Sequence, residues 1–234
     1  MAEDVLVTLI VAAAFAGVHL GAPWLSPLFH PDRPWMHSIA GGMAVAFAIL
    51  ILLPELEYVH GSVGNVVYPL MLVGLVGFYT VELAILNAAR GPRLMGEGVR
   101  ASVHLVIAWL YTFGLVYALP EQLHQHGLIV LVTSAAIGLH LAYKDYLLSH
   151  HHPTHYRRYG RFFLAASPIS GAVAALTIAP SEFVSDAILA LIAGYMLQNV
   201  FRNEVPEMRG SRPMAFAAGA LVTAAPLVVV LHLG

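Results

Sequence analysis

Ionisable side chains interrupt several long apolar stretches of this sequence, and these are the residues whose types could do chemistry. They are His19, Glu82, His104, His140, Lys144 and Asp145. Imidazole nitrogens and carboxylate oxygens are ligands that zinc and neighbouring divalent ions take in proteins. Ionisable residues inside membrane helices usually face the protein interior. Those near a helix end can instead extend to the lipid headgroups. A histidine such as His19 can also simply pack against its neighbours at a helix end.

The stretches that carry these residues are long enough to be membrane spans. Hydrophobic residues make up 59% of the chain, charged residues only 10%, and the mean hydropathy is +0.77. Soluble domains carry about 25% charged residues. Backbone groups must be hydrogen-bonded within the segment in lipid, so the spans are predicted to be helices of about 20 residues. We predict one all-α transmembrane domain over 1–234 with eight helices, roughly 4–25, 36–57, 66–88, 99–119, 127–149, 162–180, 184–203 and 214–233.

The basic residues predict how the chain is oriented. Eleven residues are Lys or Arg, and all except Lys144 are arginines in or beside the first, third, fifth and seventh connections. Short cytoplasmic loops retain positive charge. Both termini are therefore predicted to be extracytoplasmic, and the protein is expected in the plasma (inner) membrane with lipid rather than nucleic acid around it. Glu3 and Asp4 precede the first span where a signal peptide would be basic, which favours a retained helix.

Two segments resemble each other and predict an internal repeat. Ile39-Ala40-Gly41-Gly42-Met43 is followed eleven residues on by Pro54-Glu55, and Ile192-Ala193-Gly194-Tyr195-Met196 is followed ten residues on by Pro206-Glu207. The first lies in the second span and the other in the seventh, which cross in opposite directions. An inverted repeat of spans 1–3 against 6–8, with spans 4 and 5 between them, explains this better than small residues that merely allow close packing.

The second span, IAGGMAVAFAILILLPE, resembles the second helix of the ZIP (zinc/iron-regulated transporter-like) family. LIAGYMLQNVFRNEVPE in the seventh span and Ser167-Pro168-Ile169-Ser170-Gly171-Ala172 in the sixth are similar to the corresponding helices of that family. The resemblance covers nearly the whole chain, although its motifs are apolar. It implies eight helices in a 3+2+3 arrangement, a divalent ion such as zinc as the transported substrate, a metal site between the fourth and fifth helices, and a homodimer.

At that site the sequence keeps the histidines of the family and departs from its acids. His104 and His140 match the family's fourth and fifth helices and are the predicted metal ligands. Leu105 and Ala108 replace an amide and an acid, Lys144 stands where the fifth helix has an acid, and Ser167 stands where the sixth has Glu. A divalent ion in a low-dielectric site needs anionic ligands. The Lys144 ammonium could instead fill the metal's place, paired more readily with Glu82 than with the adjacent Asp145, which points about 100° away.

Other polar residues extend the candidate path. His19, Glu82, Lys144, Asp145, Ser167, Gln198 and Asn199 are the candidate path residues, although Gln198 and Asn199 could equally serve in interhelical hydrogen bonds. The histidines of the fifth connection could collect metal weakly, while the arginines after them could contact anionic lipid. These histidines are His150, His151, His152 and His155.

Three functions follow from these residues. The first is a divergent ZIP-like transporter of zinc or a similar divalent cation that works by alternating access. The second is a ZIP-fold membrane protein that has lost metal transport and acts as a sensor, a scaffold or a carrier of another substrate. The third is an intramembrane zinc hydrolase that uses His19, His104 and His140, with Asp145 or Glu82 as base. No HExxH motif supports the third, so we expect a protein that is not an enzyme and has no certain cofactor.

Overall fold

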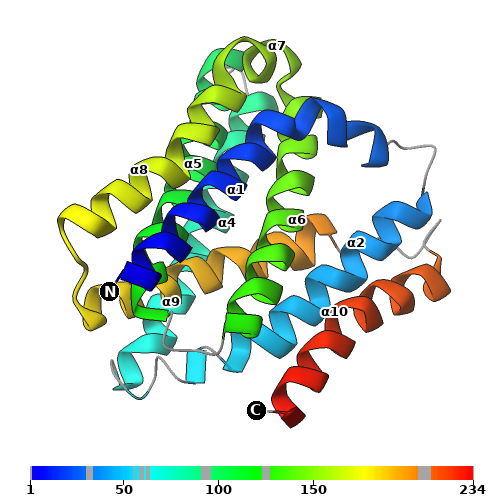
Figure 1. The fold of residues 1–234 in the computed structure, drawn as a ribbon. Helices are drawn as coiled ribbons and strands as arrows, with labels where there is room; N and C mark the ends of the chain where they lie inside the picture. The colour runs from blue at the N-terminus through cyan, green and yellow to red at the C-terminus, as the bar shows by residue number, and fades with distance from the viewer. Residues whose placement is uncertain are drawn as a thin grey trace.

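A computed structural model describes residues 2–29, 34–54, 56–57, 61, 64–90, 96–122, 127–204 and 212–233. The arginines predicted in loops at Arg33, Arg93 and Arg209 lie outside these ranges, as do Glu55, Pro206 and Glu207. Within them every element is helical (Figure 1), which confirms the all-α prediction. The elements are α1 (Ala2–Leu25), η1 (Ser26–Phe29), α2 (Pro34–Phe47), η2 (Ala48–Leu52), η3 (Gly64–Val66), α4 (Val67–Arg90), α5 (Glu97–Gln122), α6 (Gly127–His151), α7 (Pro153–His155), η4 (Tyr156–Gly160), α8 (Arg161–Thr177), α9 (Glu182–Asn199), η5 (Val200–Glu204) and α10 (Pro213–Leu233).

The long helices make this a membrane protein. Six helical segments in the described part are long and apolar enough to cross a bilayer: Glu3–Leu25, Trp35–Leu52, Gly64–Ala88, Glu97–Pro120, Pro153–Thr177 and Glu182–Arg202. Each overlaps one of the eight predicted spans, although Pro153–Thr177 begins nine residues before the predicted span 162–180. The other two predicted spans are helices as well, but α6 falls outside this set and α10 contributes a shorter apolar stretch, Pro213–Pro226.

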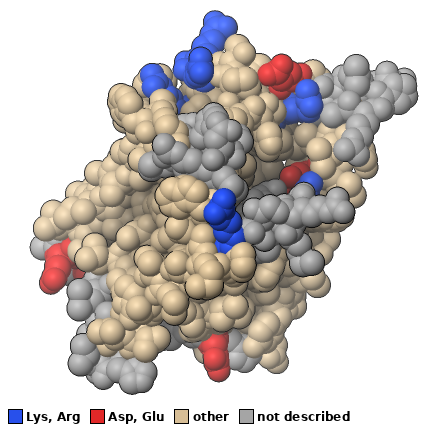
Figure 2. Space-filling view, turned by 90° about the vertical axis from the view of Figure 1, so that its right-hand side faces the viewer, with Lys and Arg blue, Asp and Glu red and all other residues tan. Residues whose placement is uncertain are grey.

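The helices pack in two groups (Figure 1). The most extensive contacts in the first group join α1 to α8, α5 to α8 and α1 to α6; those in the second join α2 to α10 and α4 to α9. The groups meet where α5 contacts α9 and where α6 contacts α2 and α10. Figure 2 shows a largely uncharged face, with most of its Lys and Arg toward the top, where Figure 1 places α7, and others at mid-height.

Close approaches at four glycines hold each of the two helix pairs of the second group. A Cβ at Gly42 would overlap the Phe216 carbonyl on α10, and one at Gly219 would overlap the Ile39 carbonyl on α2. The crossing of α4 and α9 has the same form, because a Cβ at Gly194 would overlap the Met71 carbonyl and one at Gly74 the Leu191 carbonyl. Without a hydrophobic driving force between helices in lipid, such small residues allow the backbone contact that stabilises a helix pair.

The connection between α6 and α8 is also helical, although the sequence suggested a polar loop there. α6 continues to His151, Pro153 opens the short α7, and the π-helix η4 leads directly into α8. Proline at the first helical position has no N–H that would need a partner, which explains the restart at Pro153. His152 and Tyr156 of this connection are buried, so the segment packs against the helix bundle.

The glycine crossings predict opposite effects of the same substitution at different sites. Gly194→Ala should destabilise the protein by about 1–3 kcal/mol, because the added methyl group has no room. Gly17→Ala on α1 should be neutral or slightly stabilising, since a Cβ there meets nothing within 4 Å and alanine favours helix by up to ~1 kcal/mol over glycine. Thermal unfolding of the two purified variants in detergent measures both effects. Equal stability of Gly194→Ala and the parent would contradict the packing described.

Candidate functional site

A polar cavity of about 90 Å³ lies between α4, α5, α6 and α9. Its lining includes most of the ionisable and amide residues that the sequence singled out. They are Glu82 from α4, His104 from α5, Lys144 and His151 from α6, and Gln198 and Asn199 from α9. Residues far apart in sequence thus converge on one space within a largely apolar bundle.

Glu82 has partners on the α9 side of the cavity. Its Oε2 accepts a hydrogen bond of 3.2 Å from Gln198 Nε2 and lies 3.0 Å from a guanidinium nitrogen of Arg202. Both charged side chains are partly exposed, so this pair is screened more than a fully buried one would be. The sequence suggested Lys144 as the partner of Glu82, but Arg202, which follows α9 in η5, supplies the guanidinium.

The ammonium of Lys144 lies against aromatic rings. Its Nζ is 4.0 Å from the centroid of the Tyr195 ring and 5.0 Å from that of Tyr111, and the residue is only 7% exposed. The negative faces of aromatic rings attract a cation, by ~2 kcal/mol or more where water is excluded. These two tyrosines, one from α5 and one from α9, therefore favour a charged lysine at this position.

The two predicted metal ligands line different cavities. His104 Nδ1 lies 2.8 Å from Nε2 of His152, so one ring donates a hydrogen bond to the other, and His104 also lines the polar cavity. His140 lines a small cavity on the α2 side of α6, and its ring centroid is 5.9 Å from that of Tyr111. Within the described residues, no three His, Asp or Glu side chains gather in a way that could hold a metal ion.

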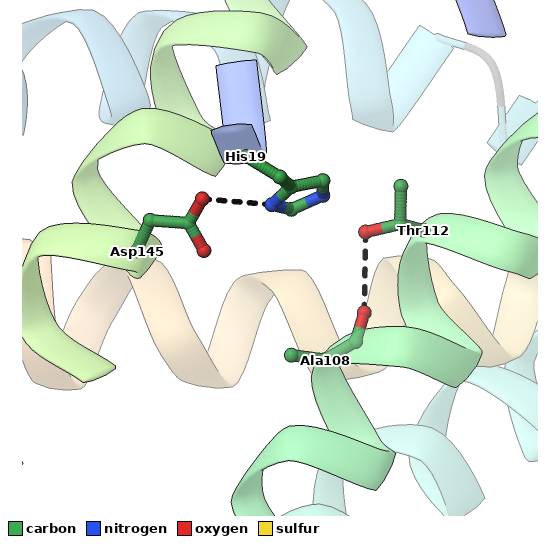
Figure 3. A network of polar contacts seen from close by, with 4 residues as sticks. All are labelled: His19, Ala108, Thr112 and Asp145. Atoms are coloured by element: carbon green, nitrogen blue, oxygen red, sulfur yellow. Dashed lines mark hydrogen bonds and ion pairs between the residues drawn. The ribbon is translucent and has the colours of Figure 1, made fainter. Parts of the chain in front are cut away.

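His19 and Asp145 form a separate buried pair on another side of α6 (Figure 3). Nδ1 of His19 lies 2.7 Å from Oδ2 of Asp145, and the two residues are 2% and 1% exposed. The His19 ring lies between the carboxylate and Thr112, whose hydroxyl donates to the Ala108 carbonyl. Ser167 lines neither cavity, because its hydroxyl donates to the Trp109 carbonyl on α5. His19 therefore has a specific buried partner, Asp145, in addition to the packing expected of a histidine near a helix end.

The histidine tract is divided among several environments. His150 Nδ1 is 3.0 Å from the carbonyl oxygen of Tyr146, and His151 lines the polar cavity. His152 bonds to His104, and His155 Nδ1 lies 3.8 Å from Glu97 Oε1 at the start of α5. The four side chains are not one cluster, so the sequence tract does not correspond to one site.

Sequence reasoning missed two residues that compensate charges at the cavity, Tyr195 and Arg202. Together with Gln198, which the sequence did single out, they are spaced by three and then four residues, which places them along one helix face. That spacing is a signal that could have found Tyr195 and Arg202. Arg202 was instead counted with the loop arginines, and Tyr195 was read only as part of the small-residue repeat.

No protein-family model matches this sequence, and no curated protein matches it significantly. The chemistry proposed for the cavity therefore depends on the residues and distances given above.

The His104–His152 contact predicts a stability that depends on pH. Burial, and then the positive charges that His104, His151 and Arg100 can carry, lower the pKa of His152 from 6.5 to about 4, against a weaker opposite effect of Glu97. The unfolded chain binds a proton at His152 more readily than the folded chain does. The contribution of His152 to the free energy of unfolding is therefore complete above pH 6.5 and is lost as the pH falls toward about 4. We expect the thermal midpoint to fall between pH 7 and pH 5 and His152→Phe to flatten that fall. His150→Phe, which alters an exposed histidine, is the control and should keep it. The same slope in His152→Phe and the parent would contradict this role.

Proposed function

We propose that this chain is a membrane transport protein with a ZIP-like helix arrangement that carries a substrate other than a metal ion at its centre. The observation that carries this proposal is the position of Lys144. It is buried, lines the polar cavity, lies against Tyr111 and Tyr195, and comes one helical turn after His140. Its ammonium takes the place of the divalent ion that the resemblance implies.

The pairing of helices supports the inverted repeat. In the proposed repeat, α1, α2 and α4 correspond to α8, α9 and α10, and α5 corresponds to α6. Exchanging the members of each pair converts the α2–α10 contact into the α9–α4 contact and the α5–α8 contact into the α6–α1 contact. All four are among the extensive contacts of the bundle. The exchange leaves the α1–α8 contact unchanged. Such a pattern is expected when two halves of opposite orientation pack around a central pair.

The glycine crossings and the π-helices support the same repeat and correct its register. The two crossings coincide when Gly42 is aligned with Gly194. That alignment places the π-helix η2 on the π-helix η5, Pro54 on Pro206 and Glu55 on Glu207. The alignment made from the sequence matched Gly41 to Gly194 and differs from this one by one residue. π-Helices are rare and are often found at functional sites, so their recurrence at equivalent positions strengthens the repeat.

The charge distribution supports the orientation proposed from the sequence, with eight crossings, both termini extracytoplasmic and the plasma membrane as the location. Arg157, Arg158 and Arg161 lie in and beside η4, while α1 begins and α10 ends in the lower half of the view in Figure 1, away from α7. The positive end would be cytoplasmic.

Transport of zinc or a similar divalent cation is the second candidate function. The observation that favours it is the His104–His152 pair, which places two imidazoles at one end of the polar cavity. It would need an anionic ligand besides, and Glu82 is already bonded to Arg202 and Gln198. The hydrolase hypothesis has less support, because His19, His104 and His140 have three separate environments.

Topology can be tested in this cysteine-free chain with single introduced thiols. Thr154→Cys lies on α7 and Ala179→Cys lies between α8 and α9, and both positions are exposed. A membrane-impermeant thiol reagent added to intact cells should label Ala179→Cys and leave Thr154→Cys unlabelled until the membrane is permeabilised. The reverse labelling pattern would overturn the proposed orientation.

The substitution of lysine for a metal can be tested by zinc binding. The purified parent should hold no zinc at its centre, whereas Lys144→Glu should gain zinc affinity and a thermal midpoint that rises with added zinc, by mass action on the folded state. Lys144→Gln is the control, because it removes the ammonium without adding a carboxylate. Bound-metal analysis and uptake into vesicles are the measurements. Zinc uptake by the parent that His104→Ala abolishes would establish the second candidate function instead.

A further inference from the structure

The buried pair of His19 and Asp145 has one more proton-binding position than the contact between the two residues uses. Nδ1 of His19 lies 2.7 Å from Oδ2 of Asp145. At this distance one proton lies between the two atoms, because two lone pairs would repel each other. Nε2 of His19 is buried and has no hydrogen-bond partner among the described residues. Polar atoms buried in this way are uncommon in folded proteins and call for an explanation.

The protonation of Nε2 decides the charge of the pair. With Nε2 unprotonated, the carboxylate is ionised and the imidazole is neutral, so the pair carries one negative charge. A proton added at Nε2 makes the ring an imidazolium, and the pair is then neutral as a whole. Imidazole is the side chain that changes its charge nearest to neutral pH. The pair can therefore take up and release one proton.

Each of these two states has a neighbour that stabilises it. Thr112 lies on the Nε2 side of the His19 ring (Figure 3), and its hydroxyl donates to the Ala108 carbonyl over 3.1 Å. The atom that Thr112 offers to the ring is therefore an oxygen lone pair, which favours a proton on Nε2. Lys144, directly before Asp145 on α6, attracts the carboxylate and favours the negative state. A proton site needs such a balance if both states are to be populated.

The carboxylate is also faced by a phenol from the connection between α6 and α8. Tyr156 of η4 is 2% exposed and lies against Asp145, and Arg161 at the start of α8 acts electrostatically on Tyr156 in turn. A phenol is a hydrogen-bond donor at neutral pH, so Tyr156 favours the ionised carboxylate. The acid of the pair therefore stays an acceptor, and the exchangeable proton belongs to the ring of His19.

The pair adjoins the polar cavity on two sides of its wall. Lys144 and Ala108 both line that cavity. Lys144 precedes Asp145, and the Ala108 carbonyl holds the Thr112 hydroxyl. Charges inside a protein are weakly screened, so a change in the charge of the pair alters the electrostatic potential in the cavity. By linkage, a charged substrate in the cavity and the proton on the pair must change each other's affinity by the same factor.

We propose that His19 and Asp145 form a proton-binding site that is coupled to the polar cavity through Lys144. The proton binds at Nε2 of His19, while Nδ1 keeps the proton that it shares with Asp145; on release, the Nε2 proton passes to water. The use of this site in substrate movement rests on the proposed function, whereas proton binding itself does not. Acids and histidines within membrane helices serve as proton relays in pumps and transporters.

Proton binding can be measured on the full-length protein in lipid nanodiscs by nitrogen NMR of labelled histidines. The His19 signals are those missing from His19→Gln. Nε2 of His19 should change from protonated to unprotonated between about pH 5 and pH 9, while Nδ1 keeps its proton. A contact that only joined α1 to α6 would show one protonation state throughout, and that result would overturn the proposal.

Thr112→Val tests the atom that binds the proton. It removes the oxygen that favours a proton on Nε2, so the His19 titration midpoint should fall by about half a pH unit. Thr80→Val is the matched control and should titrate like the parent, because the Thr80 hydroxyl also donates to the carbonyl four residues earlier, but on an exposed face of α4. An unchanged midpoint in Thr112→Val would refute Nε2 as the binding atom.

Lys144→Gln tests the coupling to the cavity. Loss of the positive charge beside Asp145 should raise the His19 midpoint by about one pH unit, whereas Lys144→Arg keeps the charge and should titrate like the parent. Equal midpoints in Lys144→Gln and the parent would refute the coupling. These measurements need no substrate, so an untitrated His19 would refute the proton site alone. Zinc-dependent uptake by the parent would refute the proposed function and leave the proton site standing.

Discussion

Charge buried in a membrane protein must be compensated by the protein itself, and α6 meets this requirement twice in succession. Lys144 and Asp145 point about 100° apart around the helix axis. The ammonium lies against Tyr111 and Tyr195, and the carboxylate is bonded to His19 on α1. A rotation of α6 by about 100° could bring the carboxylate to the aromatic rings, but it would turn the ammonium away from them and leave His19 without its partner. The two interactions therefore fix the rotation of the central helix relative to its neighbours.

The glycine crossings determine where an open groove is left between α4 and α5. α4 uses Gly74 to approach α9, and α9 uses Gly194 to approach α4. With one face of α4 committed to α9 in this way, its side toward α5 stays uncovered, and the groove opens there. The contact that holds the helices together and the opening to the lipid are thus two consequences of the same placement of small residues.

Hydropathy and charge were sufficient to predict the helices, because the bilayer imposes length and apolar character on each span independently of tertiary structure. The predicted ranges agree with the helices within a few residues for α1, α4, α5, α6 and α10. Register was harder to predict. Gly41 and Gly42 are equivalent in hydropathy, and only the close approach of Phe216 distinguishes them.

The site was predicted in part for a similar reason. Residue type indicated that Glu82, His104, Lys144, Gln198 and Asn199 belonged to the interior, and these five do line one cavity. Their partners depend on how α4, α6 and α9 rotate about their axes, which a single sequence does not encode. The sequence therefore suggested Lys144, a member of the same set, as the partner of Glu82. In the structure the partner is Arg202, which lies beyond the end of α9. His104 and His140 were grouped by resemblance, but they lie near different faces of the bundle.

The proposed internal repeat pairs residues of different character beside two cavities. In the register set by Gly42 and Gly194, Gln198 and Asn199 correspond to Ala46 and Phe47. The α9 half has amides beside a charged cavity, while Phe47 lines a cavity whose walls are apolar apart from residues such as Thr133 and Ser134. A water-soluble ion crossing between the two halves would lose polar contacts as it moved from one cavity to the other.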